Sequence, residues 1–198
     1  MAITKKSLGP KAVVFPTPVF VVGTYDKLGR PNVMTAAWGG ICCSSPPAVC
    51  VSLRKATYSY RNILEKKAFT VNIPSEELMK EADFFGLTSG RDVDKFSAAG
   101  IKPVRSDLVD APYIQEFPLT LECKLVNFTD LGLHTQFVGE VMDVKADERI
   151  MEKGKLSIEK IKPLVFDPEA GRYYALGKYV GKAFKTGEIF SMPRDKME

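Results

Sequence analysis

The sequence predicts a mainly β domain with short helical insertions, built as an antiparallel barrel of the Greek-key type. About seven or eight segments rich in β-branched and aromatic residues lie between turn residues, as strands do. They do not alternate regularly with helical segments, which a doubly wound sheet would require. The 198 residues contain no repeat and no interdomain linker, so we expect a single domain over residues 1–198.

The first third of the chain is expected to hold three strands. Pro18–Tyr25 is rich in β-branched and aromatic residues, and the turn residues Asp26–Arg30 lead from it into Asn32–Trp38, which predicts a hairpin. Ala48–Leu53 forms the third strand, since the prolines of Ser45-Pro46-Pro47 stop the segment before it.

The middle of the chain changes its hydrophobic period. Apolar residues at helical spacing predict a helix over residues 58–67, with Thr57 as its cap. A strand over Ala68–Ile73 follows, and Ser75 is expected to cap a second helix. The stretch from Gly90 to Gly100 is expected to be short, broken helix.

The last part of the chain returns to strands. Leu119–Phe128 and Thr135–Val144 are the longest strand candidates, and the turn residues between them predict a long antiparallel hairpin. The charged segment Asp147–Leu156 is expected to be helical. A strand pair at Leu164–Phe166 and Arg172–Leu176 completes the domain.

Composition excludes several classes of protein. Hydrophobic residues make up 45% and charged residues 26%, as in soluble globular proteins. No apolar run reaches the roughly 18–20 residues of a membrane span, and the N-terminus lacks the apolar stretch of a signal peptide. The net charge of +4 comes without a basic nucleic-acid motif. We expect a cytoplasmic protein with neither a membrane nor a nucleic-acid partner.

Cysteine and histidine usage argues against a metal site. Cys42, Cys43, Cys50 and Cys123 form no C-x-x-C pair and are expected to be reduced and mostly buried thiols. His134 is the only histidine, so no two-histidine metal site can form. It is either a hydrogen-bonded structural residue or a donor near a ligand. Neither G-x-G-x-x-G nor a P-loop motif occurs, so any phosphate must be held by side chains and loop amides.

Small residues surround Trp38. Ala36, Ala37, Gly39 and Gly40 would let a planar ligand lie close to the backbone, where amides could bind its polar edge. The alternative is structural: small residues allow a strand to bend sharply at a barrel corner.

A second candidate segment runs from Ser52 to Arg61. It combines Arg54, Lys55 and Arg61 with several hydroxyl groups around a predicted helix start, and phosphate sites use these groups. The alternative is a capped helix with solvated surface charges. The carboxylate pairs of the next predicted helix, Glu76/Glu77 and Glu81/Asp83, are expected to be solvated rather than catalytic.

Taken together, these residues resemble the flavin reductase-like family with its flavin mononucleotide (FMN)-binding split barrel, and within it the flavoredoxin type. The resemblance covers a core of about residues 10–180. It rests on an ordered set of segments: Pro18–Gly23, Gly29–Trp38, Ser45-Pro46-Pro47, Ser52-Leu53-Arg54, Thr57-Tyr58-Ser59, Phe69–Asn72, Asp94-Lys95-Phe96 and His134–Val141.

The resemblance implies FMN as the cofactor and assigns residues to its parts. The segment from Thr35 to Trp38 would run along the isoalloxazine ring, and that from Ser52 to Ser59 would hold the ribityl chain and phosphate. The implied cofactor-binding residues are Thr35, Ala36, Ala37, Trp38, Ser52, Leu53, Arg54, Thr57, Tyr58, Ser59, Asn72, Lys95, Phe96 and His134. Asn72, Lys95 and Phe96 would help to close the pocket, and His134 would lie near the ring.

The resemblance also implies a homodimer and a flavin-dependent oxidoreductase whose ring carries the redox chemistry, with no side chain acting covalently. Here Leu133 precedes His134, where many two-component flavin reductases have Gly-Asp-His. NAD(P)H and another redox protein therefore both stay open as the electron donor. The alternative from another class is a non-catalytic β-barrel that binds a ligand or nucleic acid.

Overall fold

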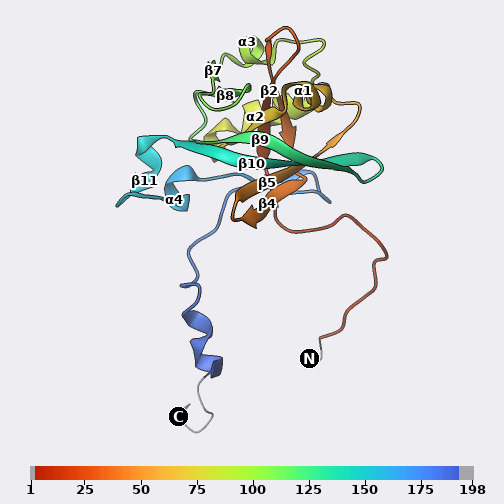
Figure 1. Ribbon diagram of the computed structural model, residues 1–198. Helices are drawn as coiled ribbons and strands as arrows, with labels where there is room; N and C mark the ends of the chain where they lie inside the picture. Colours follow the sequence, from red (N-terminus) through yellow and green to blue (C-terminus); the bar gives the residue numbers. More distant parts are fainter. Residues whose placement is uncertain (1–2, 192–198) are drawn as a thin grey trace.

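The computed structural model describes residues 3–191, and its centre is one antiparallel sheet of seven strands (Figure 1). Their spatial order is β3-β2-β6-β9-β10-β5-β4. The strands are β2 (Phe20–Tyr25), β3 (Pro31–Ala36), β4 (Gly39–Ser44), β5 (Pro47–Arg54), β6 (Ala68–Ile73), β9 (Leu119–Asp130) and β10 (His134–Ala146). Strand β5 lies beside β10 rather than β6, which is the predicted Greek-key connection.

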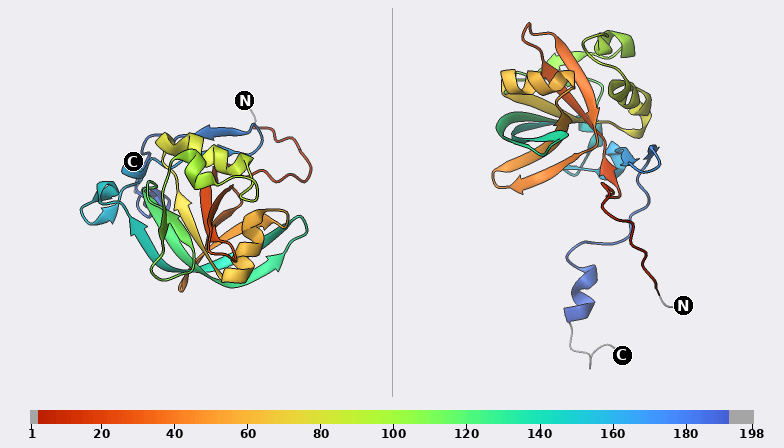
Figure 2. Two further views of the ribbon diagram at one scale, coloured as in Figure 1. Left: turned by 90° about the horizontal axis from the view of Figure 1, so that it is seen from above. Right: turned by 90° about the vertical axis from the view of Figure 1, so that its right-hand side faces the viewer.

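The sheet curls around its core without closing (Figure 2). Within residues 3–191, no ladder of hydrogen bonds joins the two edge strands β3 and β4. Three smaller sheets accompany it. Their strands are β1 (Thr17–Pro18) with β13 (Val165–Asp167) and β14 (Arg172–Tyr174), β7 (Pro103–Arg105) with β8 (Pro112–Ile114), and β11 (Met151–Glu152) with β12 (Lys155–Leu156).

The helices are all short, and α1, α2 and α3 pack against the main sheet. The α-helices are α1 (Tyr58–Lys66), α2 (Met79–Leu87), α3 (Lys95–Ala99) and α4 (Ile158–Ile161), and the 3₁₀ helices are η1 (Glu76–Leu78), η2 (Glu148–Ile150) and η3 (Thr186–Ser191). No helix in the described part of the chain is long and apolar enough to cross a membrane.

Both faces of strand β2 are buried, because two clusters of apolar side chains form on either side of it. Val22 packs with Phe69 and Phe137 in the cluster that α1 covers. Val21, the next residue in the alternation, packs with Phe85 and Phe96 in the cluster beneath α2 and α3. The sheet is therefore a wall between two cores, and α2 and α3 are held against the face of β3.

The turn between β2 and β3 depends on a buried carboxylate. Asp26 is 3% exposed and accepts hydrogen bonds from the backbone amides of Leu28 and Arg30. The Arg30 guanidinium and the Tyr58 hydroxyl also donate to it, at 2.7 and 2.8 Å. Burial alone would raise the pKa of Asp26, but these hydrogen bonds outweigh it and hold the pKa at about 2.

Most predicted elements are present, with small shifts at their ends. The hairpin β2–β3, strands β5 and β6, helix α1, the long β9–β10 hairpin and the late pair β13–β14 are confirmed. The predicted caps Thr57 and Ser75 stand at helix starts, but their side chains do not cap. The Thr57 hydroxyl instead donates to the Arg54 carbonyl, at 2.9 Å.

Two expectations of local structure are wrong, and one strand was missed. Gly39–Ser44 forms the strand β4, for which the sequence made no prediction. The segment Asp147–Leu156 is helical only in the short η2, because Lys153 and Gly154 adopt positive φ and turn the chain into the β11–β12 hairpin. The short helix expected between Gly90 and Gly100 is present as α3. Cys42 and Cys43 are exposed rather than buried, though all four thiols are free.

Two arms leave the body on the same side (Figures 1 and 2). Residues 3–16 approach β1 as an extended chain, and residues 177–191 run away from the body and end in η3.

Candidate functional site

A groove of about 370 Å³ lies where β3, the start of α1 and the connection between α2 and α3 meet. Its walls come from segments that are far apart in the sequence. They are Asn32, Met34 and Thr35 from β3; Arg54 from β5; Ala56, Thr57, Tyr58 and Ser59 around the start of α1; Phe85–Arg91 from the end of α2 and the loop after it; and Lys95 from α3.

The groove is electropositive. Three cationic side chains line it, those of Arg54, Arg91 and Lys95, and no carboxylate is among its lining residues. Helix α1 adds the positive end of its dipole, since its first turn lines the groove and no side chain caps it. An anionic group therefore fits this groove better than a neutral or cationic one.

Asn32 presents a buried acceptor without a partner. Its amide nitrogen donates to the Ser59 hydroxyl oxygen at 2.9 Å, but its Oδ1 atom makes no hydrogen bond. The loop after α2 presses against this atom, because a Cβ placed on Gly90 would lie 1.9 Å from Asn32 Oδ1. A buried acceptor of this kind is costly unless a donor reaches it. A hydroxyl group of a bound polyol chain would supply that donor.

Lys95 is buried at the floor of the groove, with 4% of its surface exposed. Its ammonium group donates to the carbonyls of Val33, at 2.9 Å, and Phe85, at 2.7 Å. Burial lowers the pKa of Lys95 to about 8.

Arg91 ties the loop after α2 to the start of α1. Its guanidinium donates to the Ala56 carbonyl at 3.0 Å and lies over the Tyr58 ring, 5.5 Å from the ring centre. Tyr58 in turn donates to Asp26. Burial, followed by the hydrogen bond to Asp26, raises the pKa of the Tyr58 hydroxyl. The groove wall is therefore anchored to the β2–β3 turn.

The four residues expected along a ring separate in the structure. Thr35 lines the charged groove and donates its hydroxyl proton to the Ala82 carbonyl. Ala36 is buried in the core. Ala37 and Trp38 line a different, mainly apolar groove of about 390 Å³, together with Gly39 and residues of the N-terminal arm and β1.

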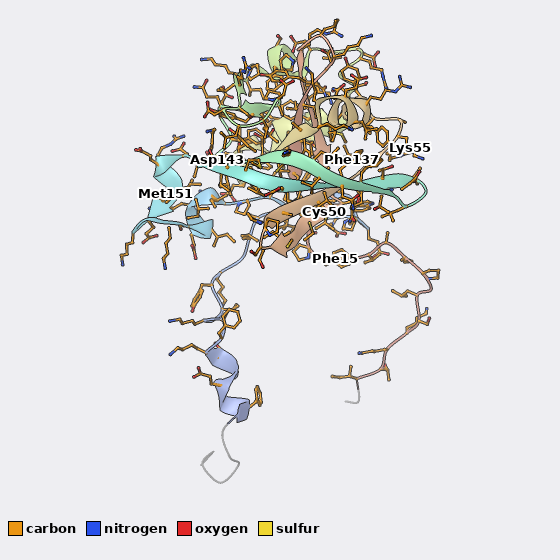
Figure 3. The ribbon with its side chains drawn as sticks, in the orientation of Figure 1. Phe15, Cys50, Lys55, Phe137, Asp143 and Met151 are labelled. Atoms are coloured by element: carbon orange, nitrogen blue, oxygen red, sulfur yellow. The ribbon has the colours of Figure 1, made fainter. Side chains whose placement is uncertain are left out.

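The residues at the end of β5 divide in the same way. Arg54 lines the charged groove, while Leu53 is a core residue that is 1% exposed. The Ser52 amide donates to the Trp38 carbonyl at 2.7 Å and so connects the two regions. Lys55 points away toward the tip of the β9–β10 hairpin, where it pairs with Asp130 (Figure 3).

Two other predicted site residues are buried in the protein interior. Asn72 is fully buried and its amide is fully used: the nitrogen donates to Val21 and Thr70, and the oxygen accepts from Ile114 and Thr120. Phe96 belongs to the core beneath α2 and α3. Neither side chain is among those lining the charged groove.

His134 begins β10 directly opposite Arg54 in the β5–β10 pairing. It is half-buried and does not line the charged groove. No group of three or more His, Cys, Asp or Glu side chains in the described part of the chain could hold a metal ion.

The sequence reasoning missed Asn32 and the loop from Thr88 to Arg91 as groove residues. Asn32 belongs to the segment that carries the family resemblance, so a signal for it was present. Arg91 carries no such signal, since only the fold brings its loop across the start of α1.

The family model for the flavin reductase like domain matches residues 12–176. The chain belongs to this family. Flavoredoxin of Desulfovibrio vulgaris (Miyazaki F) has 51% identical residues and a TM-score of 0.89, over 93% of this chain and 100% of that one. Flavoredoxin from Methanosarcina acetivorans has 32% identity and a TM-score of 0.88, over 94% and 100%.

A split barrel domain protein from Shewanella frigidimarina shares 21% identity over 86% of this chain and 87% of its own, with a TM-score of 0.77. This likeness concerns the fold alone, and it identifies the curled open sheet as a split barrel. The expected fold class is thus confirmed. Nothing found in the described residues or in these relatives supports the alternative of a non-catalytic binding barrel.

Proposed function

We propose that this protein binds FMN and transfers electrons through it, as a flavin-dependent oxidoreductase or electron carrier. The observation that carries the proposal is the electropositive groove, with three cations, an uncapped helix start and no carboxylate, in a chain that shares 51% identity with a flavoredoxin. When bound, FMN supplies a ring that accepts and returns electrons. No side chain is required to act covalently.

The groove residues divide between the parts of the cofactor. Arg54, together with the backbone amides of Tyr58 and Ser59 and the Ser59 hydroxyl, holds the phosphate through charge and hydrogen bonds. The unpartnered Oδ1 of Asn32 accepts from a ribityl hydroxyl. The segment from Thr35 to Trp38 leads from the charged groove to the apolar groove and follows the ring.

Four other predicted residues do not line the charged groove. Leu53, Asn72 and Phe96 are buried and fix the strands and helix that present the groove. His134 lies opposite Arg54 in the β5–β10 pairing, outside the lining of the charged groove. Trp38→Ala is expected to weaken FMN and riboflavin to the same extent, because the two flavins share the ring. A change in FMN affinity alone would contradict the role of Trp38.

We also propose that the protein works as a homodimer. The arms hold large apolar side chains in water, including Phe184 at 99% and Val180 at 92% exposure. Such surface marks a contact with another chain. Sedimentation equilibrium of the full chain and of a chain ending at Leu176 tests this. We expect a dimer for the first and a weaker dimer for the second, and a monomeric full chain would contradict the proposal.

We also propose that the protein is located in the reducing cytoplasm. Cys42 and Cys43 are exposed and free, and such thiols persist where cellular reductants keep them reduced. Thiol titration of freshly lysed, alkylated cells would find all four cysteines reduced. Extensive oxidation before lysis would contradict this location.

The visible absorption spectrum of the purified protein tests the main proposal. Bands near ~370 and ~450 nm, present on purification or after FMN is supplied, are the expected result. The absence of both bands would contradict flavin binding. Bleaching on anaerobic addition of NADH would assign a nicotinamide donor, whereas persistence of the bands would assign a redox protein as donor.

A further inference from the structure

Three of the four cysteines gather on the neighbouring strands β4 and β5. Cys42 and Cys43 lie on β4 and are exposed, and Cys50 lies on β5 and is half-buried (Figure 3). Cys123 is buried in the core, away from them. Neither the charged groove nor the apolar groove has a cysteine among its described lining residues. The three thiols are therefore a separate cluster of nucleophilic groups, at the β4 edge of the main sheet.

The backbone brings Cys42 toward Cys50. Gly40 lies directly opposite Cys50 in the β4–β5 pairing, and Cys42 is the next residue but one along β4. Side chains two residues apart on a strand point to the same face, so Cys42 and Cys50 are diagonal neighbours. A Cβ placed on Gly40 would meet nothing within 4 Å, so the space beside Cys50 is open to the Cys42 side chain.

The thiols are also close enough to affect one another's ionisation. Partial burial raises the pKa of the Cys42 thiol, and the neighbouring Cys50 and Cys43 thiols raise that pKa further. Cys43 is directed elsewhere, because its thiol donates to the Ser45 carbonyl at 3.4 Å, within the turn between the two strands. Cys42 and Cys50 are therefore the pair that can meet.

We propose that Cys42 and Cys50 form a reversible dithiol–disulfide site that a low-molecular-weight disulfide oxidises. The Cys42 thiolate attacks one sulfur of the oxidant and forms a mixed disulfide, and the other half of the oxidant leaves as a thiol. The Cys50 thiolate then attacks the Cys42 sulfur and releases the second half as a thiol. One cross-strand disulfide forms, the oxidant's S–S bond breaks, and the protons of the pair end on the two released thiols.

The position of the pair suits a reversible bond. Diagonal neighbours on two strands lie about 7–8 Å apart at Cα, whereas most disulfides span roughly 4.4–6.8 Å, so the bond closes only when β4 shifts. Within residues 3–191, β4 pairs with β5 alone in the main sheet, and a bulge between Ile41 and Cys43 already interrupts that ladder. The shift is therefore small in cost. Strained and exposed disulfides are the ones that cellular thiols reduce again.

The bridge acts on the segment that carries Trp38. Strand β4 begins at Gly39, directly after Trp38, and the Ser52 amide donates to the Trp38 carbonyl at 2.7 Å. The backbone of Cys50 packs against Gly39, since a Cβ placed on Gly39 would lie 2.6 Å from the Cys50 carbonyl oxygen. Drawing β4 toward β5 at Cys42 therefore moves the strand next to Trp38. Trp38 is the only tryptophan, so its fluorescence reports this movement.

The experiment identifies the bond by mass. The purified protein is reduced, freed of reductant, equilibrated with oxidised glutathione and alkylated. The tryptic peptide of residues 28–54, which carries all three clustered cysteines, is then weighed without reduction. We expect it to be lighter by a pair of hydrogen atoms and to carry glutathione or the alkyl group on one cysteine only, and a dithiol reductant should reverse the change. Modification of all three cysteines without a bridge, or a disulfide-linked dimer, would overturn the proposal.

Single serine variants assign the pair. Cys42→Ser and Cys50→Ser should form no bridge within this peptide. Cys43→Ser is the matched control, because it removes the adjacent thiol of the same strand and should form the bridge as the wild type does. A bridge that persists in Cys42→Ser or Cys50→Ser would involve Cys43 and would overturn the assignment. Should Cys50→Ser not fold, Cys42→Ser decides alone, since Cys42 is exposed.

The emission of Trp38 tests the link to its segment. Oxidation should change this emission reversibly in the wild type and in Cys43→Ser, and should leave it unchanged in Cys42→Ser. A bridge that forms without any change in Trp38 emission would overturn the link. Neither measurement depends on flavin affinity, so a failure of the proposed function leaves both tests of the dithiol site intact.

Discussion

Asp26 and Lys95 are both buried, and their charges are treated in opposite ways. Asp26 receives two backbone amides, the Arg30 guanidinium and the Tyr58 hydroxyl, and its pKa falls to about 2. Lys95 receives two carbonyls and no counterion, and its pKa falls to about 8. In Asp26 the charged form is stabilised, whereas in Lys95 it is penalised.

The difference separates a charge with charged and polar donors around it from a charge held by neutral carbonyls alone. The partners of Asp26 lie within the chain, so the β2–β3 turn is complete by itself. Lys95 lines a groove whose lining residues include no carboxylate, and its ammonium group is held by neutral carbonyls alone. Its burial therefore costs stability that an ionic partner would offset.

The largest expected effect concerns the apoprotein at alkaline pH. Because the pKa of Lys95 is lower in the folded than in the unfolded chain, the unfolded chain binds more protons between about pH 8 and 10.5, and stability rises with pH there. Relative to Lys95→Met, the wild-type free energy of unfolding should gain up to roughly 3 kcal/mol across this window. Urea denaturation of both proteins measures it, and a constant difference would contradict a penalised Lys95 charge.

Asp26→Asn should lower the free energy of unfolding by about 2 kcal/mol at pH 7, because the charge-assisted bonds from Arg30 and Tyr58 are lost. In the wild type this stabilisation is present above the ordinary pKa of 3.8 and disappears as the pH falls toward 2. Denaturation of both proteins at pH 7 and near pH 2.5 checks this.

The control for Asp26 is Asp147→Asn. Asp147 pairs with Arg149, whose side chain is 87% exposed, so the expected loss is about 0.5 kcal/mol or less. Equal losses for the two variants would show that the buried network of Asp26 has no special weight.

Gly90→Ala should weaken FMN binding about tenfold or more, since the added Cβ would collide with Asn32 Oδ1 and displace the loop that forms the groove wall. Gly177→Ala is the matched control, because a Cβ there meets nothing within 4 Å. Calorimetric titration with FMN compares them. Unchanged affinity in Gly90→Ala would remove this loop from the site.

The smallest expected effect distinguishes two neighbouring cations. Arg54→Ala should reduce the preference for FMN over riboflavin about three- to tenfold, because Arg54 is exposed and its charge is screened by water. Lys55→Ala should change nothing, since Lys55 pairs with Asp130 outside the groove. Equal loss of both flavins in Arg54→Ala would contradict its phosphate role.

The sequence was informative where local chemistry decides structure. The turn at Asp26–Arg30, the helix start at Thr57 and the long β9–β10 hairpin follow from turn residues and hydrophobic period. It failed at β4, whose strand forms because β5 offers an edge to Gly39–Ser44 despite their low strand propensity. It failed again at Lys153-Gly154, where a positive-φ turn overrides helix-competent residues.

The candidate site could be anticipated only in part. Arg54, Thr57 and Ser59 are close in sequence and in space, so a local pattern located them. The loop carrying Arg91 and the buried acceptor of Asn32 required the fold, because β6, η1 and α2 separate residues 56–59 from residues 90–91 along the chain. Asn72 is the opposite case, because the sequence predicted it as a site residue. Only its four hydrogen bonds show that it is a core residue.

The most direct test of the account is a crystal structure of the FMN complex. We expect the phosphate in the charged groove, within hydrogen-bond distance of the first turn of α1 and of the Arg54 guanidinium, and a ribityl hydroxyl on Asn32 Oδ1. A phosphate placed in the apolar groove beside Trp38, or anywhere out of reach of both Arg54 and the first turn of α1, would contradict it.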